Sequence, residues 1–413
     1  MQPDKKQIDA VTESVMDVYK RVSPSFIESI TSQGKKKEFF LKWSNFLVKK
    51  LKIPPLLFRG ASVLDAGCGI GEKSLVYAAM GADVTGIDVN EKAIAMARKR
   101  AADWGLGLQG KAEFRTGSVF EIDTGVLFDI VICDGVIHHT ADPGKAFDNI
   151  ARLLRPGGVL VLGAAEPCGF FQRQLQRYFV NKIAGSSDEK TKADVASMLF
   201  AEKLERAAEA SGRSVKAATY DSFINPHVAP VPFCDVKTWM ARHGIHMDCS
   251  WPSVELPLQT DSQYHPLLKN DNPAVLRWER LARFLWMLND KYDKESFALY
   301  ANHDPVLFNF LNDVSAICTD TMLDTKKLEQ VMSGIGEIST APLPGFNVKK
   351  DFTDFIQDIL RIDREIDAMK FRKFSAERIA EGLHFKRLFS GFSGVGMVYY
   401  RGTRDTEDME SIR

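Results

Sequence analysis

The sequence predicts an α/β protein whose core is a mainly parallel sheet. Short apolar runs alternate with helical patterns from about residue 60 to 166, a glycine-rich turn follows the first run, and an aspartate ends the second. Alternating strands and helices are typical of parallel sheets, because each return to the same end of the sheet needs a crossover connection. The 413 residues leave room for large additions around such a core.

The composition is that of an ordinary globular protein, with 45% hydrophobic and 26% charged residues. Lys and Arg total 54, as do Asp and Glu, so the basic excess typical of nucleic-acid binders is missing. No window approaches the ~18 consecutive apolar residues of a membrane span, the N-terminal stretch lacks the apolar core of a signal peptide, and the six cysteines form no CxxC pair. We therefore expect a cytoplasmic protein with reduced thiols, no membrane span and no nucleic-acid partner.

The stretch SVLDAGCGIGEKS (62–74) is the strongest local signal. Its start is predicted to be a buried strand, and its end opens a helix that stops at Gly81. The glycines therefore fall in a strand-to-helix turn, which can bring a nucleotide-like ligand against bare backbone and a helix N-terminus. The dinucleotide fingerprint G-x-G-x-x-G would need a third glycine where the chain has Glu72.

Three further strand-like runs extend this pattern. ADVTGIDVN (82–90) is predicted to be a second strand that ends at Asp88, 21 residues after Gly67. This spacing is close to the ~20 residues at which an acid accepts hydrogen bonds from ribose hydroxyls. A third strand and turn follow at 112–122, and the stretch 128–163 is predicted to hold two more strands around a helix.

The pattern Asp65-x-Gly67-x-Gly69-x-Gly71, together with Asp88 and the string GVIHHTADP, resembles the class I S-adenosylmethionine-dependent methyltransferases. The resemblance covers about residues 60–166 and continues more weakly to 253. It implies a Rossmann-like seven-stranded sheet, with an N-terminal helical lid and large, mostly helical additions. It also implies S-adenosyl-L-methionine as cofactor and S-adenosyl-L-homocysteine as product, with no metal.

The resemblance places the cofactor contacts along the strand ends. Asp65 and the backbone near Gly67 would hold the methionine end, and Asp88 the ribose. Ser118 stands where many members have an aspartate, so a contact with the adenine amino group stays open, and Val119 packs either on the ring or in the core. Asp134 and Gly135 would lie beside the sulfonium. The expected cofactor-binding set is Asp65, Gly67, Gly69, Gly71, Asp88, Ser118, Val119, Asp134 and Gly135.

Candidate catalytic residues follow the fourth and fifth strands. Methyl transfer depends mainly on proximity and alignment, but an oxygen acceptor can need a general base, for which histidine is the commonest choice near neutral pH. His138 and His139 are the nearest candidates, with loop packing, helix entry or lining of the cofactor as alternatives. Glu166, just past the fifth strand, faces either the acceptor or water.

The rest of the chain is divided by pattern. Residues 1–58 are predicted to form a helical lid and 59–166 the cofactor-binding core. Residues 167–253 would form a helical cap and return to the sheet. Residues 254–393 form either a helical insertion or an appended helical domain, and their apolar stripes serve as core or as a homodimer face. Residues 394–404 would supply the final strand.

Two segments hold candidate acceptor contacts. The lid offers aromatic residues, and a proline-interrupted loop at 220–231 offers polar ones. Plain packing is the alternative for each. The candidate acceptor contacts are Tyr19 in the lid, and Tyr220, Asn225 and His227 in the loop; Phe26 and Trp43 would line the lid over the cofactor beside Tyr19.

The sequence therefore predicts an S-adenosylmethionine-dependent methyltransferase that modifies an N, O or C atom of a small or medium-sized metabolite. Two alternatives stay open: methylation of a protein or RNA, and a non-catalytic cofactor-binding scaffold or regulatory subunit. The neutral charge balance favours a small molecule over RNA.

Overall fold

The computed structural model describes residues 3–22, 32–104, 107–185, 188–254, 348–383 and 396–406, with isolated residues at 275–276, 279, 282–283, 286, 326–327 and 329–330. Two compact units make up the chain. The first unit comprises Met1–Ala165, Glu205–Pro252 and Met397–Arg413, and the second comprises Glu166–Leu204 and Ser253–Gly396. Phe26, Cys318 and most of the helices expected between 254 and 347 lie outside the described residues.

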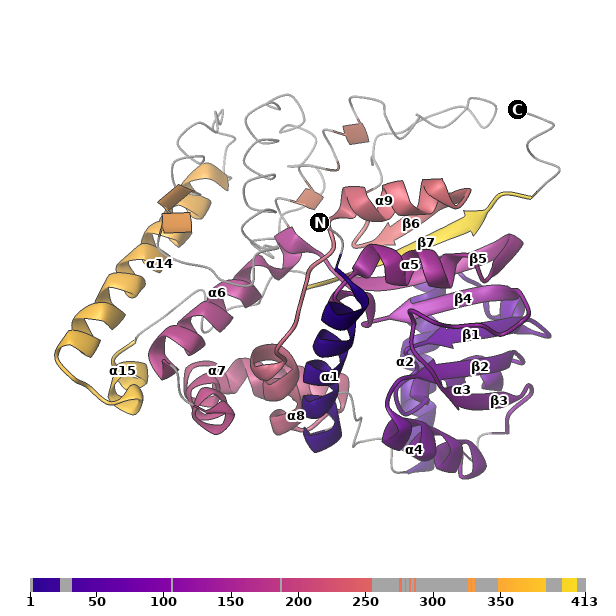
Figure 1. Ribbon diagram of the computed structural model, residues 1–413, viewed down its shortest axis with the longest axis horizontal. Helices are drawn as coiled ribbons and strands as arrows, with labels where there is room; N and C mark the ends of the chain where they lie inside the picture. The colour runs from indigo at the N-terminus through magenta and orange to yellow at the C-terminus, as the bar shows by residue number, and fades with distance from the viewer. Residues whose placement is uncertain are drawn as a thin grey trace. The chain divides into compact units, whose positions relative to one another are not determined.

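The first unit is built on one seven-stranded sheet with the order β3-β2-β1-β4-β5-β7-β6 (Figure 1). The first five strands are parallel, and β7 runs antiparallel between β5 and β6. The predicted α/β fold with a seven-stranded sheet is therefore confirmed. The strands are β1 Ser62–Ala66, β2 Asp83–Asp88, β3 Ala112–Thr116, β4 Phe128–Asp134, β5 Leu154–Ala165, β6 Ile245–Trp251 and β7 Met397–Arg404.

Helices cover both faces of this sheet. On one face, α2 (Gln33–Lys49) packs on α3 (Glu72–Ala79), and α3 also contacts α4 (Glu91–Ala102). On the other face, α5 (Pro143–Ala151) lies beside α9 (Phe233–Arg242) (Figure 1). Because apolar side chains point to both faces of the central strands, the core forms two layers, as parallel strands require. β1 shows this directly, with four consecutive buried residues.

Local side-chain caps start the helices where the strands end. Asn90 accepts hydrogen bonds from two backbone N–H groups at the start of α4, and Asp142 accepts one at the start of α5, where Pro143 takes the first helical position. These caps satisfy donors that a helix N-terminus leaves without partners. The residues just before α4 and α5 therefore determine where these two helices begin.

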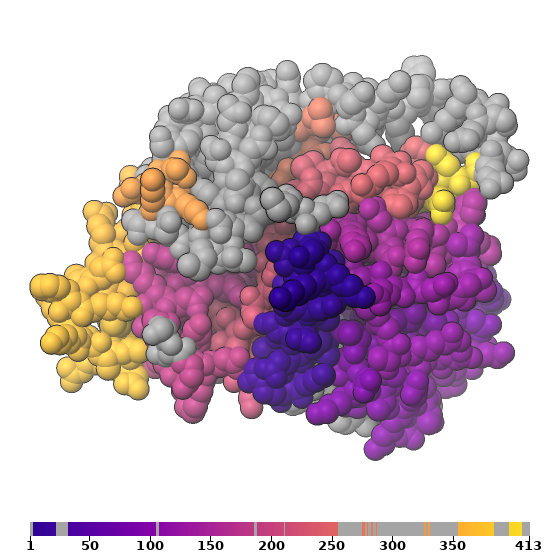
Figure 2. Space-filling model, in the orientation of Figure 1, coloured from indigo at the N-terminus to yellow at the C-terminus, as the bar shows by residue number. Residues whose placement is uncertain are grey.

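Shorter elements complete the first unit. α1 (Lys5–Val22) lies at its surface, indigo in Figure 2, and contacts η3 (Tyr220–Ile224). η3 is a π-helical turn that continues α8 (Val215–Thr219), so the prediction of a loop starting at residue 220 was wrong for its first five residues. The remaining short elements are η1 (Pro55–Phe58) and η2 (Ile137–His139).

The described part of the second unit is helical. It contains α6 (Pro167–Ala184), α14 (Val348–Phe371) and α15 (Ala376–Gly382), and the chain passes from the second unit into the first within α7 (Glu189–Ser211). Asp363 of α14 is buried, and it accepts hydrogen bonds from Tyr178 and Lys182 of α6 at 2.6 and 2.5 Å. These contacts join residues about 180 positions apart.

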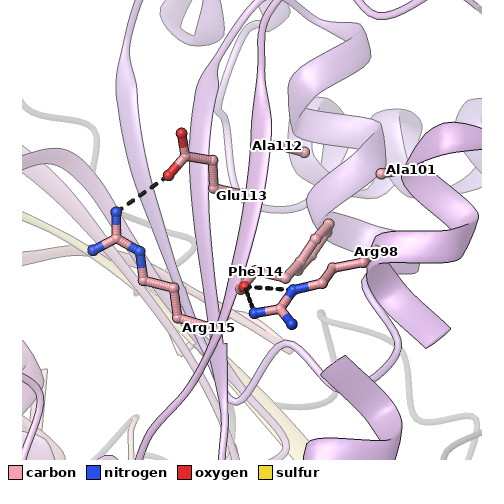
Figure 3. Close-up of a pocket in the computed structure, with 6 residues that line it drawn as sticks. All are labelled: Arg98, Ala101, Ala112, Glu113, Phe114 and Arg115. Atoms are coloured by element: carbon pink, nitrogen blue, oxygen red, sulfur yellow. Dashed lines mark hydrogen bonds and ion pairs between the residues drawn. The ribbon is translucent and has the colours of Figure 1, made fainter. Parts of the chain in front are cut away.

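None of the helices in the described residues is long and apolar enough to cross a bilayer. The five cysteines among them are free thiols. A hollow of about 390 Å³ lies beside the edge strand β3 (Figure 3). There the Arg98 guanidinium donates two hydrogen bonds to the Phe114 carbonyl, at 3.1 and 2.8 Å. Arg98 thus covers an edge carbonyl that would otherwise be open to another strand.

Candidate active site

The glycine turn after β1 is shaped by the chain's own packing. Gly67 and Gly71 both have φ +80°, a region that favours glycine. A Cβ on Gly67 would overlap the Val136 side chain, and one on Gly71 would lie 2.8 Å from the Phe114 ring. The Gly67 N–H also donates to the Ile87 carbonyl at 2.7 Å. These two glycines are therefore required by the protein itself, whatever ligand approaches the turn.

Asp88, at the end of β2, is tied to the same turn. Its Oδ2 accepts a hydrogen bond from the Gly69 N–H at 2.8 Å, and its Oδ1 accepts one from the Asn90 N–H at 2.8 Å. Burial raises the pKa of Asp88, and these two backbone donors oppose the rise. Each carboxylate oxygen has a second lone pair, so the oriented carboxylate can still accept two hydroxyl donors.

Asp65, within β1, is a buried carboxyl with a single short hydrogen bond from a side chain. The Ser74 hydroxyl donates to its Oδ2 at 2.6 Å. Burial raises the pKa of Asp65 to about 6; Ser74 and then Lys73 oppose this shift, while Asp134 and Asp88 add to it. Three carboxyl groups thus interact at the ends of three adjacent strands, and a cationic ligand placed there would relieve their repulsion.

Asp134, at the end of β4, has a partner that the sequence did not suggest. The Lys73 ammonium pairs with Asp134 Oδ2, and the Tyr399 hydroxyl lies 3.5 Å from the same oxygen. The Lys73 ammonium also lies 4.1 Å from the centroid of the Trp43 ring, so α2 contacts this end of the site through Trp43. Lys73 was missed because its pairing depends on β4, 61 residues away; its only sequence signal is its place just after the glycine turn. Around Gly135 (φ +77°), no heavy atom of the described residues, its two chain neighbours aside, would lie within 4 Å of an added Cβ.

Ser118 and Val119 lie in the turn after β3. The Ser118 hydroxyl accepts a hydrogen bond from the Phe120 N–H at 3.2 Å, and the Val119 carbonyl accepts one from the Asn149 side chain at 2.8 Å. Both residues are half-buried. These bonds fix the shape of the turn, and a contact of either side chain with adenine stays a prediction.

The two adjacent histidines of η2 have different surroundings. His138 is buried, and the Ala165 N–H donates to its Nδ1 at 3.3 Å. Burial lowers the pKa of His138 well below its usual value, and His139 and His227 lower it further. Because Nδ1 accepts this backbone bond, we assign the proton of the neutral ring to Nε2. His138 therefore packs as a neutral residue and is a poor candidate for a base.

His139 is half-buried and meets several polar groups. Its Nδ1 lies 3.0 Å from the His227 carbonyl and 3.2 Å from Asn225 Nδ2. Because a carbonyl oxygen can only accept, we assign the Nδ1 proton to that bond, which leaves the lone pair of the neutral ring on Nε2. Of the two candidate bases, His139 is the better placed.

Residues from two distant segments surround His139. Tyr19 of α1 lies edge-on to its ring, with centroids 6.3 Å apart. Asn225 is fully buried, accepts a hydrogen bond from the His227 N–H at 3.2 Å, and bonds the Tyr19 hydroxyl. Its own N–H donates to the Tyr220 carbonyl at 2.9 Å. Burial raises the pKa of Tyr19, so its hydroxyl stays neutral at physiological pH. The structure thus brings Tyr19, His139, Asn225 and His227 together with the Tyr220 backbone carbonyl, and we call this set the acceptor cluster after its predicted role.

Glu166 belongs to the second unit and has a different setting. It is fully buried. Its Oε2 accepts a hydrogen bond from the Gly169 N–H at 3.0 Å, which caps α6, and its Oε1 accepts one from the Arg283 Nε at 2.9 Å. Both oxygens are engaged in holding structure, so Glu166 is a poor candidate for the acceptor contact suggested by its place after β5.

Comparisons with known proteins indicate a methyltransferase domain. Residues 57–210 match a family profile described as a methyltransferase domain. A ubiquinone biosynthesis O-methyltransferase of Bordetella avium is 40% identical over 102 residues, which are 24% of this chain and 41% of that one. The mitochondrial protein of the same name from Schizosaccharomyces pombe is 36% identical over 105 residues, 25% of this chain and 38% of that one. The chain spans only about two fifths of the length of these curated relatives.

Solved structures include two similar chains. Magnesium protoporphyrin IX methyltransferase from Synechocystis PCC 6803, with bound SAM, is 16% identical, covers 59% of this chain and 86% of its own, and has a TM-score of 0.34. A protein described by the conversion of a disulfide bond into a thioacetal group during echinomycin biosynthesis is 34% identical, covers 28% of this chain and 47% of its own, and has a TM-score of 0.25.

Proposed function

We propose, from the premise that residues 57–210 place this chain in the class I S-adenosylmethionine-dependent methyltransferase family, that it transfers a methyl group from S-adenosylmethionine to an oxygen of a small hydroxylated metabolite. The observation that carries the proposal is the row of strand-end acids beside a pre-formed glycine turn. Asp88, Asp65 and Asp134 end or nearly end the adjacent strands β2, β1 and β4.

The acid row fits the shape and charge of this cofactor. Neighbouring strands lie ~4.8 Å apart, so the row extends over roughly 10 Å. Asp88 would accept the ribose hydroxyls, and the cationic methionine end would lie toward Asp65 and Asp134. A positive charge there would favour the ionised form of Asp65, whose pKa in the free protein is about 6. When bound, the cofactor supplies a methyl carbon activated by its sulfonium.

The acceptor cluster supports oxygen as the accepting atom. His139 Nε2 would take the proton from an acceptor hydroxyl, while the His227 carbonyl holds the opposite ring nitrogen. The neutral Tyr19 hydroxyl and Asn225 would orient the acceptor by hydrogen bonds. The burial of Asn225 favours a small molecule over a protein or RNA chain. A cytoplasmic location and a homodimer stay predictions from the sequence.

The test is calorimetric titration with S-adenosylhomocysteine. Asp88→Ala removes both proposed ribose bonds, each worth about 1.5–3 kcal/mol, so the affinity should fall at least about a hundredfold. Asp83→Ala, at the exposed other end of the same strand, is the matched control and should bind like the natural chain. Circular dichroism checks that both variants are folded.

Three outcomes bear on the proposal. Absence of binding to the natural chain would refute it, and equal affinity of the Asp88→Ala chain would remove Asp88 from the ribose site. Binding without methyl transfer to any of a panel of phenols and catechols would instead support the cofactor-binding scaffold.

A further inference from the structure

The segment of residues 33–60 differs in charge from the rest of the chain. It contains eight Lys and Arg residues and one Glu, although the whole chain has a net charge of zero. Lys36 is turned inward and donates to the backbone carbonyls of Asp103 and Trp104, and Lys35 faces Glu38. The other basic side chains of this segment are exposed: Lys37, Lys42, Lys49, Lys50, Lys52 and Arg59.

Large apolar side chains are exposed within the same segment. Leu41 and Val48 of α2 are 50% and 37% exposed. They lie seven residues apart and so share one side of the helix. Leu56 and Leu57 of η1 are 70% and 47% exposed. Exposed apolar side chains that gather in one patch can mark a site of protein or membrane interaction, and these four lie within 17 residues of sequence.

The exposure of these residues is not explained by poor packing of α2 or η1. The opposite side of α2 packs into the core through Trp43, Phe46 and the fully buried Leu47. Next to the exposed leucines of η1, Phe58 is fully buried and anchors the turn. Each element therefore has a satisfied inner side and a second, outward apolar side. We call these two outward sides, together with the basic residues of the segment, the α2–η1 face.

We propose that the α2–η1 face docks this chain on a bilayer surface that contains anionic lipids. Leu56 and Leu57 would enter the boundary between headgroups and acyl chains, and the basic side chains would lie against the headgroup phosphates. Near an anionic leaflet each basic residue strengthens binding about fivefold. The pairing of exposed leucines with cations favours this partner over nucleic acid, which offers no apolar boundary for the leucines.

The test is sedimentation of the full chain with vesicles of phosphatidylcholine, with and without phosphatidylglycerol. We expect binding to the mixed vesicles, at least tenfold weaker binding to pure phosphatidylcholine, and weakening by salt. L56S/L57S and K49E/K52E should each lower binding at least tenfold. The matched controls are V126S/L127S, at 59% and 51% exposure, and K99E/K111E, also exposed. They should stay within about twofold of the natural chain.

Several results would overturn the proposal. One is equal binding of the natural chain to both kinds of vesicle, and another is an equal loss in the control variants. Light scattering without lipid supplies a third: if the L56S/L57S chain is monomeric where the natural chain is a dimer, the face joins two copies instead. S-adenosylhomocysteine affinity, measured in parallel, should not change in these variants, which separates this proposal from the proposed function.

Discussion

Two buried carboxyl groups, one in each unit, have opposite surroundings. Asp65, in the first unit, is 5% exposed, and its short side-chain hydrogen bond comes from the neutral Ser74 hydroxyl. Glu166, in the second, is fully buried and is compensated by both an Arg283 guanidinium and a backbone N–H. The first carboxyl is poorly compensated in the free protein, whereas the second is satisfied.

This difference agrees with the proposed binding role of Asp65 and with a structural role for Glu166. A buried charge that lacks full compensation lowers stability and is retained where a ligand completes it. A buried charge with a complete set of partners serves folding, and removing one partner is costly. Substitution of the two acids should therefore change stability in opposite directions.

The larger effect is expected at Glu166. Glu166→Gln leaves the Arg283 charge buried and less compensated, with the weaker electrostatic contribution of Glu279 remaining. We expect a loss of about 3–5 kcal/mol in the free energy of unfolding, since breaking a buried pair is strongly destabilising. Urea unfolding at neutral pH measures it. Glu377→Gln, an exposed acid of the same unit, should change stability by less than about 0.5 kcal/mol. If the two variants behave alike, Glu166 does not hold the second unit together.

The smaller effect, of opposite sign, is expected at Asp65. Asp65→Asn removes a buried carboxylate whose pKa is raised from 3.8 to about 6, so the variant should be up to about 3 kcal/mol more stable at pH 7.5. The same variant should bind S-adenosylhomocysteine much more weakly. Asp9→Asn, on the exposed side of α1, is the control. A destabilised Asp65→Asn chain would show that the carboxylate is compensated after all.

The pH dependence gives the sign of this second effect independently. Because the folded chain binds the Asp65 proton more tightly than the unfolded chain, ionisation of Asp65 destabilises the fold. This cost is absent below about pH 4, grows as the pH rises toward 6, and is complete above that. The extra stability of the Asp65→Asn chain should follow the same course and disappear in acid.

The proposed cofactor-binding part of the site could be predicted because its residues lie close together in the sequence. Strand, glycine turn, helix and second strand follow one another within about 30 residues, so spacing alone placed Asp65 and Asp88 at one end of the sheet. The local pattern indicated the first five strands, whereas the total of seven came from the family resemblance. Strands and helices can be recognised in a sequence because each has its own spacing of apolar residues, and this spacing is set by neighbouring residues.

The residues of the acceptor cluster could be listed from the sequence, but the contacts between them could not be predicted. Tyr19, His139 and Asn225 come from segments about a hundred residues apart, and only the folded chain shows that Asn225 bonds the Tyr19 hydroxyl beside the His139 ring. The same holds for the pairing of Lys73 with Asp134 and for Arg283 beside Glu166. The π-helical turn at Tyr220 was missed because the prolines from Pro226 onward are typical of a loop, and the predicted loop was extended to the helical residues before them.

The place of β7 in the sheet has a consequence for the order of synthesis. β6 joins the sheet only through β7, and β7 begins at Met397, about 145 residues after β6 ends at Trp251. As the chain leaves the ribosome, β1 to β5 can pair at once, whereas β6 must wait for a partner translated much later. Long-range pairing of this kind is slow, so the nascent chain holds its glycine turn and acid row well before the sheet is closed.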